Sequence, residues 1–295
     1  SAPTRPPGTS ACTSSCPSSS ACPKGRNSQD TRSQPFSPIP AMKRAYSLKS
    51  SYMTQILRRY IFGDEPCEKI IKDPALLHSN TFEERFEEML HPYIGKSRTE
   101  LKAQFGITSI AKNINEILVA AMLGLKGRLA STDEFQKASI VPKTITIGPG
   151  NTIKESMSFP AMDFCKMVNE KWEESNLYNC LAPTKFLFIV FKREDDGEYY
   201  FRRIKFWNIP IEDLEEVHRV WQRAVDILRE GVHIWKDSRG RNCNNLPKAS
   251  ESNVAHVRPH GVNSMDTAPL PTGGEMTKQC FWLNSTYVAE QIKEV

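Results

Sequence analysis

The run Phe186-Leu187-Phe188-Ile189-Val190-Phe191 is uniformly apolar, and it limits the folds open to this chain. A strand of large apolar residues without a polar one among them is buried on both faces, because a half-exposed strand alternates apolar and polar side chains. An Asp-Asp-Gly turn at 195–197 then returns the chain into a second strand over 199–207 as a hairpin. A buried central strand needs cover on both faces, so the run predicts a sheet flanked by helices.

The segments around this run supply the helices and further strands. Residues 80–90 open with an N-cap candidate and place apolar side chains on one face, and residues 110–125 predict a second, largely buried helix. Residues 211–231 predict a long amphipathic helix that ends at its glycine. Residues 140–147 and 153–159 predict two strands joined by a Gly-Pro-Gly-Asn turn. This order of elements predicts an α/β fold with a mixed central sheet flanked by helices.

Charge is distributed unevenly along the chain. Of 39 basic and 34 acidic side chains, nine basic and one acidic lie in residues 1–60, which leaves 30 and 33 in the rest, a net charge of −3. Binding of nucleic acid by the folded part must therefore come from a local basic patch rather than from bulk charge. Residues 1–40 are rich in Ser and Pro and poor in large apolar side chains, so we expect this segment to be disordered.

The cysteines and the hydropathy pattern indicate where the protein resides. The eight cysteines form no Cys-x-x-Cys pair and no His–Cys group with zinc-ligand spacing. This pattern favours reduced thiols, with disulfides or a metal site as the alternative. No apolar run reaches the ~18 residues of a membrane span, and no signal peptide opens the chain. We therefore expect a soluble, cytoplasmic protein without a membrane partner.

A stretch near the start of the chain recurs at its end. Residues 43–57 align without gaps with residues 278–292, and both predict a short strand that runs into an amphipathic helix. Two copies of one closing element indicate that residues 41–60 are the tail of a preceding, missing domain and that residues 61–295 form the next one. Chance similarity between two amphipathic segments is the alternative. The identical pairs are Lys43/Lys278, Leu48/Leu283, Ser50/Ser285 and Tyr52/Tyr287.

The segment from Asp133 to Lys143 is the one that should carry the chemistry of a metal-dependent nuclease. Such an enzyme holds divalent cations on two or three carboxylates beside the scissile phosphate, and a lysine activates water or stabilises the developing charge. The usual arrangement is an Asp followed by Glu-x-Lys on a strand, where alternation aims the Glu and the Lys at one face. In this chain the second part reads Val141-Pro142-Lys143.

Together with its neighbours this segment resembles the family of the MutH mismatch-repair endonuclease and the GATC-cleaving restriction enzymes. The resemblance spans about residues 75–295 and rests on an ordered set of motifs. It implies a MutH-like restriction-endonuclease fold in a bacterial protein. The motifs are residues 112–124, Lys143-Thr144-Ile145, Phe206-Trp207-Asn208, His256-Val257-Arg258-Pro259 and residues 281–287.

The resemblance also implies that most of the nuclease centre is absent. The family's helix glutamate falls on Ala120 and the Glu of its Glu-x-Lys pair falls on Val141, and neither side chain binds a cation. The family's aspartate falls on Glu134, which leaves Glu134 and Lys143 as a remnant site. One carboxylate holds Mg²⁺ only weakly, so we expect no metal site and no cofactor for binding. Glu116, one helical turn before Ala120, is an alternative carboxylate.

The resemblance further implies which residues face DNA. Sequence reading requires side chains at base edges, and backbone grip requires basic and small polar groups on loops. The stretch from Arg258 to Tyr287 matches the family's recognition region, although a structural arginine paired with a carboxylate is the alternative for Arg258. The predicted contacts are Lys112, Arg258, His260, Asn263, Lys278 and Tyr287.

Three functions are consistent with these features. The restriction enzymes of this family resemble a tandem duplication of an active half and a degraded half that binds a second copy of the recognition sequence. The leading hypothesis is a domain that binds GATC duplex DNA as the effector half of a type II restriction enzyme, with a MutH-like catalytic domain in the same or a second chain as its partner. An active Mg²⁺-dependent endonuclease built around Glu134 and Lys143 is the first alternative, and a structural half that only packs on the catalytic domain is the second.

Overall fold

The computed structural model describes residues 19–23, 31–34, 37–42, 44–48, 50–63, 67–153 and 156–293. The chain divides into two compact units: a larger unit of residues 73–129 and 141–295, and a smaller unit of residues 1–72 with 130–140. The segment that carries the nuclease motif is divided between them, because Glu134 belongs to the smaller unit and Lys143 to the larger one.

The first sheet of the larger unit is built around the apolar run. Its central strand is β7 (Lys185–Arg193), with β5 (Ile140–Ile147) on one side and β8 (Tyr199–Trp207) on the other. All residues from 186 to 191 are buried, and β7 pairs antiparallel with β8 from the Phe186/Trp207 pair to the Arg193/Tyr199 pair. The predicted buried strand and hairpin are confirmed.

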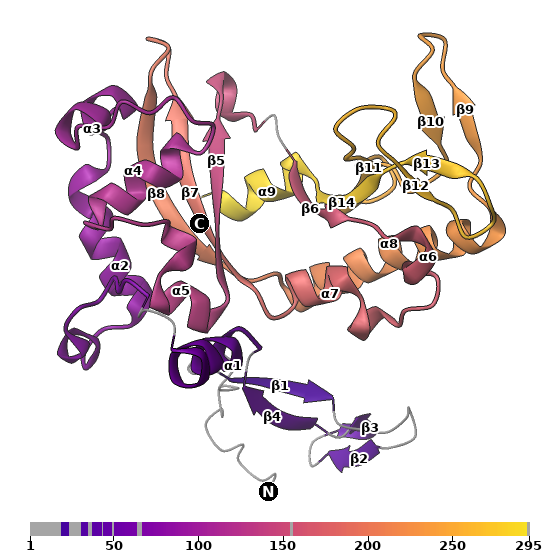
Figure 1. Ribbon diagram of the computed structural model, residues 1–295, viewed down its shortest axis with the longest axis horizontal. Coiled ribbons are helices and arrows are strands. Elements are labelled where there is room, and N and C mark those ends of the chain that lie inside the picture. The colour runs from indigo at the N-terminus through magenta and orange to yellow at the C-terminus, as the bar shows by residue number, and fades with distance from the viewer. Residues whose placement is uncertain are drawn as a thin grey trace, which may run out of the picture. The chain divides into compact units, whose positions relative to one another are not determined.

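Helices α2 (Phe82–Leu90), α3 (Arg98–Gln104) and α4 (Ile114–Met122) lie beside this sheet (Figure 1). Thr81 and Ser97 begin the first two of these helices, and each closes a capping box that satisfies backbone N–H groups of the first turn. Helix α3 contacts β8 and α4 contacts β7. The predicted helices over 80–90 and 110–125 are therefore present, with slightly later starts.

A second antiparallel sheet of the larger unit has the order β11-β14-β6. Its strands are β11 (Ala255–Pro259), β14 (Gln279–Leu283) and β6 (Met157–Ala161). The predicted long helix is α8 (Ile211–Glu230), whose buried residues recur every three or four positions. The other α-helices and strands of this unit are α6 (Phe164–Met167), α7 (Asn176–Leu181), β9 (Ile234–Lys236), β10 (Asn242–Asn244), β12 (Thr267–Pro269), β13 (Glu275–Thr277) and α9 (Ser285–Ile292).

One hydrophobic core joins the two sheets of the larger unit. It includes Ile145 of β5 and Phe188 of β7, Trp221 of α8, and Leu283 and Tyr287 from the last strand and helix. Because the two sheets share these buried side chains, the strands that carry the candidate site are held in one packed body.

The second of the two predicted strands begins later than expected. It was placed over 153–159, whereas β6 is Met157–Ala161. Ile153 instead forms a single bridge with Ile147, and residues 154–155 lie outside the described part. Gly150 in the intervening turn has a φ of 73°, a left-handed conformation that glycine adopts without strain. The α/β class is confirmed, and the MutH-like fold stays a prediction.

The smaller unit pairs four short strands as two antiparallel pairs and adds helices. β1 (Ser19–Pro23) pairs with β4 (Arg44–Leu48), and β2 (Thr31–Gln34) pairs with β3 (Ser37–Met42). Within residues 1–40 the described stretches are thus strands, which differs from the disorder expected there, and the rest of that segment lies outside the described residues. The helices are α1 (Ser50–Leu57), a π-helical turn (Arg58–Phe62) and α5 (Asp133–Ala138).

The repeat seen in the sequence recurs as matching secondary structure. β4 starts at Arg44 and β14 at Gln279, 235 residues later, and α1 and α9 start at Ser50 and Ser285, again 235 residues apart. Both strands are five residues long and both helices eight. The predicted strand-then-helix pattern is therefore confirmed in both copies.

The repeat also reaches further back than residue 43. β1 and β11 are the antiparallel partners of β4 and β14, and each ends in a proline, Pro23 and Pro259. After these prolines the sequence reads Pro-Lys-Gly-Arg-Asn-Ser-Gln-Asp-Thr over 23–31 and Pro-His-Gly-Val-Asn-Ser-Met-Asp-Thr over 259–267, identical at six of nine positions. A small hairpin follows in each copy, β2 with β3 and β12 with β13. The agreement therefore extends from the sequence to the order of the paired strands.

Replacing Phe188 by Ala should lower the free energy of unfolding by about 3–5 kcal/mol, because the side chain is fully buried at the centre of β7 and its loss leaves a cavity. Urea denaturation followed by circular dichroism measures this change. Ile110→Ala, at a residue that is 96% exposed, serves as the control and should shift the value by less than about 0.5 kcal/mol. Equal effects of the two substitutions would contradict the assignment of β7 as the central strand.

Candidate nucleic-acid interface

Two positions of the expected nuclease centre carry apolar side chains in the larger unit. Ala120 is buried in α4, and Val141 lies on β5 with 38% of its surface exposed. Lys143 is two residues further along β5, so its side chain leaves the strand on the same face as that of Val141. Neither Ala120 nor Val141 offers an oxygen atom to a cation.

Glu134 has a structural task within the smaller unit. Its carboxylate accepts hydrogen bonds from the backbone N–H groups of Ile70, at 3.0 Å, and of Ile71, at 2.9 Å. This carboxylate therefore ties residues 70–71 to helix α5, and two buried backbone donors depend on it. Sequence reasoning treated Glu134 as the remnant of a metal site, whereas the structure uses it to satisfy the main chain.

The described residues do not fit a magnesium ion. No group of three or more His, Cys, Asp or Glu side chains within these residues is arranged to hold a metal. Glu116, the alternative carboxylate, is half-buried on α4, and burial raises its pKa against the opposing effect of Arg128. A raised pKa means that the surroundings disfavour the charged carboxylate that Mg²⁺ requires.

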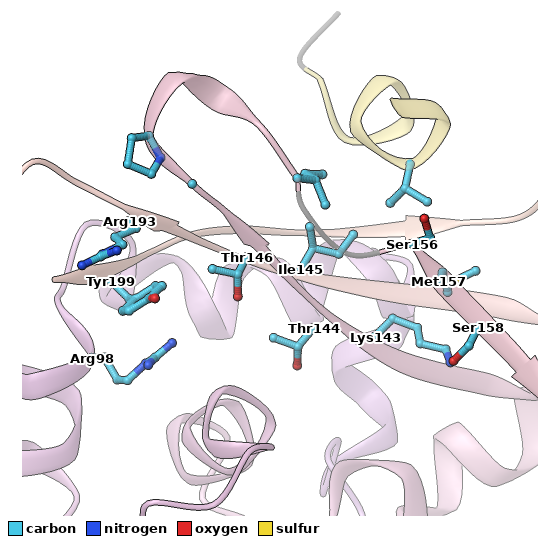
Figure 2. A pocket seen from close by; sticks show the side chains of 14 residues that line it. Arg98, Lys143, Thr144, Ile145, Thr146, Ser156, Met157, Ser158, Arg193 and Tyr199 are labelled. Carbon is cyan, nitrogen blue, oxygen red and sulfur yellow. The ribbon is translucent and has the colours of Figure 1, made fainter. Parts of the chain in front are cut away.

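Lys143 lines a cavity of about 460 Å³ in the larger unit (Figure 2). The part of its lining that the structure describes has three basic side chains, Arg98, Lys143 and Arg193, and no Asp or Glu. The hydroxyl groups of Thr144, Thr146, Ser156 and Ser158 also line it. Basic side chains and hydroxyl groups are the ones that bind phosphate oxygens, and an acid beside them would repel the phosphate. Sequence reasoning found Lys143 but missed both arginines, because only the fold brings them to this cavity.

The ammonium group of Lys143 is available for a ligand. It has no hydrogen bond and no ion pair with the described residues. Burial lowers the pKa of Lys143, and the nearby Cys180 thiol opposes this shift in part. A lysine with a lowered pKa and no partner is stabilised in its charged form by an incoming anion.

Arg258 and His260 lie around one indole ring beside the second sheet. The guanidinium carbon of Arg258 is 4.3 Å from the ring centroid of Trp282, and the His260 ring meets the same indole edge-on at 5.6 Å. Both Arg258 and His260 are exposed. The arrangement differs from the alternative of an arginine paired with a carboxylate, because the partner of Arg258 is an aromatic face.

The loop over 260–266, called the tip loop below, is held by Asp266 and Lys278. The Asp266 carboxylate accepts the N–H of Val262 at 3.0 Å and forms an ion pair with the Lys278 ammonium at 2.6 Å. The hydrogen bonds that Asp266 accepts from the Lys278 side chain and from the Val262 N–H lower the pKa of its carboxyl group. A Cβ on Gly261 would lie 3.0 Å from the carbonyl oxygens of Asn263 and Asp266, so any larger residue would require the backbone of the loop to shift. Lys278, predicted to contact DNA, is thus engaged within the loop.

The residues that recur between the two copies are those that hold this loop. Pro259, Gly261, Asn263 and Asp266 all recur, and the Asn263 side chain accepts the N–H of Met265 at 2.9 Å. At three positions the two copies differ: Lys24, Arg26 and Gln29 in the first copy correspond to His260, Val262 and Met265 in the second. Val262 is 92% exposed and Met265 is 83% exposed. In the second copy, the differing positions are therefore ones whose side chains are open to a ligand.

Two further predicted contacts lie in different surroundings. Tyr287 is 5% exposed, its hydroxyl donates to Asp213 at 2.6 Å, and its ring packs edge-on against Trp207. Burial and the Asp213 carboxylate raise its pKa. Tyr287 therefore belongs to the core in this structure and is not presented to a ligand. Lys112 is exposed in the segment before α4.

Comparison with known proteins gives the class to which these features correspond. No protein-family model matches the chain. The chain is nevertheless similar in sequence to a type II restriction enzyme, in agreement with the resemblance of its motifs. It is 38% identical over 93% of its length to the type II restriction enzyme Sau3AI of Staphylococcus aureus. It spans 64% of the length of that relative. Among the described residues no helix combines the length and apolar character of a bilayer span.

Replacing Asp266 by Ala should speed hydrogen exchange of the Val262 amide by about tenfold or more, because a hydrogen bond to a charged group contributes about 1.5–3 kcal/mol. Exchange measured by mass spectrometry or NMR tests this change. Glu275→Ala is the control, since its carboxylate binds Thr267 in the adjoining hairpin and leaves the tip loop intact. Equal exchange of Val262 in wild type and Asp266→Ala would show that the carboxylate does not hold the loop.

The affinity for a phosphate-bearing duplex should fall as pH rises through the lowered pKa of Lys143 in the free protein. A bound phosphate favours the charged ammonium, so binding takes up a proton wherever the free side chain is neutral. Lys143→Arg should flatten this profile, because a guanidinium stays charged throughout. Fluorescence anisotropy across the neutral to alkaline range measures both profiles, with Lys171→Arg, at an exposed lysine outside the predicted contacts, as the control. Indistinguishable profiles for wild type and Lys143→Arg would remove Lys143 from the interface.

Proposed function

We propose that this chain binds double-stranded DNA containing GATC without cutting it, as the effector half of a type II restriction endonuclease. The observation that carries the proposal is the state of the nuclease centre. Ala120 and Val141 offer no side-chain ligand atoms, the Glu134 carboxylate is taken by backbone amides, and Lys143 lines a cavity with no acid among its described lining residues. Such a site attracts phosphate but supplies no bound metal to activate water.

The cavity lined by Arg98, Lys143 and Arg193, called the basic cavity below, and the tip loop would bind different parts of the duplex. The cavity would hold the phosphate backbone, which contributes affinity without sequence information. The tip loop and Arg258 would read base edges, since an arginine pairs with guanine and exposed apolar side chains such as Val262 and Met265 contact thymine methyl groups. The sequence GATC contains both guanine and thymine.

The repeat supports a second domain of the same kind as the partner. Val288 and Ile292 of α9 are 3% and 5% exposed, whereas the corresponding Met53 and Leu57 of α1 are 40% and 44% exposed. The same helix thus has its apolar face covered in one copy and uncovered in the other. We infer that α1 closes a further MutH-like domain, which would carry the catalytic carboxylates in the same or a second chain.

A mobility-shift titration without divalent cations tests the binding. The chain should bind a GATC duplex at least ~10³ times more tightly than a scrambled duplex. Arg258→Ala should weaken GATC binding by about 1–3 kcal/mol and scrambled binding much less, because it removes a base contact. Arg223→Ala, at an exposed arginine that is paired with Glu251 and is not among the predicted contacts, is the matched control. Equal affinity for the two duplexes would refute the proposed specificity.

A cleavage assay separates this proposal from the active-enzyme alternative. GATC plasmid incubated with the chain and Mg²⁺ should remain intact. Cleavage that Lys143→Ala abolishes would establish an active endonuclease instead. If the chain binds neither duplex but forms a tight complex with a separately supplied active half, the structural alternative holds.

A further inference from the structure

Three side chains at one end of the basic cavity form a group that the nuclease motif does not include. Arg98 begins α3, Arg193 ends β7 and Tyr199 begins β8. Figure 2 shows Tyr199 between the two arginines, with Lys143 toward the other end of the cavity. The three residues come from separate elements and converge on one ring.

The tyrosine ring orients both guanidinium groups. The guanidinium carbon of Arg98 is 4.0 Å from the centroid of the Tyr199 ring, and that of Arg193 is 5.9 Å from it. The Nε of Arg193 also donates to the carbonyl oxygen of Gly197 at 3.3 Å, in the turn that joins β7 to β8. A guanidinium stacked on an aromatic face keeps its plane, so its remaining N–H groups stay aimed in fixed directions.

The backbone before Arg98 is fixed to the same sheet. The N–H of Gly95 donates to the carbonyl of Phe201 at 2.8 Å, and the N–H of Phe201 donates to the carbonyl of Lys96 at 3.0 Å. Ser97 forms a bridge with Tyr200 and begins the capping box of α3. Arg98 is therefore held at a constant distance from Tyr199 by main-chain hydrogen bonds.

Neither arginine has an ionic partner among the described residues. Within these residues neither Arg98 nor Arg193 has a carboxylate oxygen within ion-pair distance, and the buried Nε of Arg98 has no hydrogen-bond partner. The one carboxylate with a resolved electrostatic effect on Arg98 is that of Glu198, which accepts the Thr99 hydroxyl at 2.9 Å. Two like charges on one ring repel each other, and an anion bound between their free N–H groups removes that repulsion.

We propose that Arg98, Arg193 and Tyr199 form a clamp for the phosphodiester backbone of the bound duplex. The inference rests on the proposed DNA binding and adds a grip that is separate from Lys143 and from the tip loop. Both guanidinium groups present forked donors, which match the oxygens of a phosphate. The clamp touches no base edge, so it contributes equally to every DNA sequence.

The salt dependence of binding tests the clamp. Each phosphate contact contributes about 0.9 to the slope of log K against log salt concentration on duplex DNA. Arg98→Ala and Arg193→Ala should each reduce this slope by about one, and should weaken GATC and scrambled duplexes by the same factor. Arg98→Lys keeps the charge and should restore most of the slope. Arg219→Ala is the matched control, because Arg219 is exposed on α8 and paired with Glu216.

The outcomes separate this inference from the proposed function. If wild type binds DNA and both alanine variants, shown to be folded by their thermal melting, keep the wild-type slope, the clamp is refuted while DNA binding stands. A loss confined to the GATC duplex would also refute it, since that result identifies a base contact. If wild type binds no duplex at any salt concentration, the proposed function fails and the clamp fails with it.

Discussion

The burial of β7 on both faces is the constraint on which the rest of the larger unit depends. Its six consecutive apolar side chains are removed from water only when helices and the second sheet cover them. That requirement fixes β5 and β8 as its neighbours. Lys143 on β5, Arg193 at the end of β7 and Tyr199 at the start of β8 then lie around one cavity. The placement of these side chains therefore depends on β7, although Arg193, its last residue, is the one β7 side chain that lines the cavity.

The sequence predicts local structure well and long-range hydrogen bonding poorly, and particular residues show why. The buried strand, its hairpin and the amphipathic α8 follow from the spacing of apolar side chains, which is a local property. The task of Glu134 does not, because its partners Ile70 and Ile71 precede it by more than 60 residues and donate through their backbone. Arg98 and Arg193 meet at one ring although 95 positions separate them. Only the paired strands bring such residues together.

The family resemblance identified candidate site residues, and the structure shows which of them are engaged within the protein. The Lys143 ammonium has no hydrogen bond or ion pair with the described residues and can therefore contact a phosphate. Tyr287 instead donates to Asp213, and Lys278 forms an ion pair with Asp266. Comparison of the two copies of the repeat also separates residues that shape the loop from residues whose side chains vary. Pro259, Gly261, Asn263 and Asp266 recur in the sequence of the first copy, whereas His260, Val262 and Met265 do not. A residue whose hydrogen bonds or close backbone approach shape a loop allows few substitutions, whereas an exposed side chain without such a contact is free to change.

The proposed replacement of the family's carboxylates by Ala120 and Val141 would change the electrostatics of the domain as well as its chemistry. In an active metal-dependent nuclease, acidic side chains repel the DNA backbone until a cation neutralises them, so metal and DNA depend on one another. The cavity beside Lys143 is lined by three basic side chains and, among the described residues, by no Asp or Glu. The field of these side chains attracts phosphate in the absence of any metal. Under the proposed function the domain would gain from this charge distribution, because its occupancy would report the presence of a duplex independently of the supply of divalent ions.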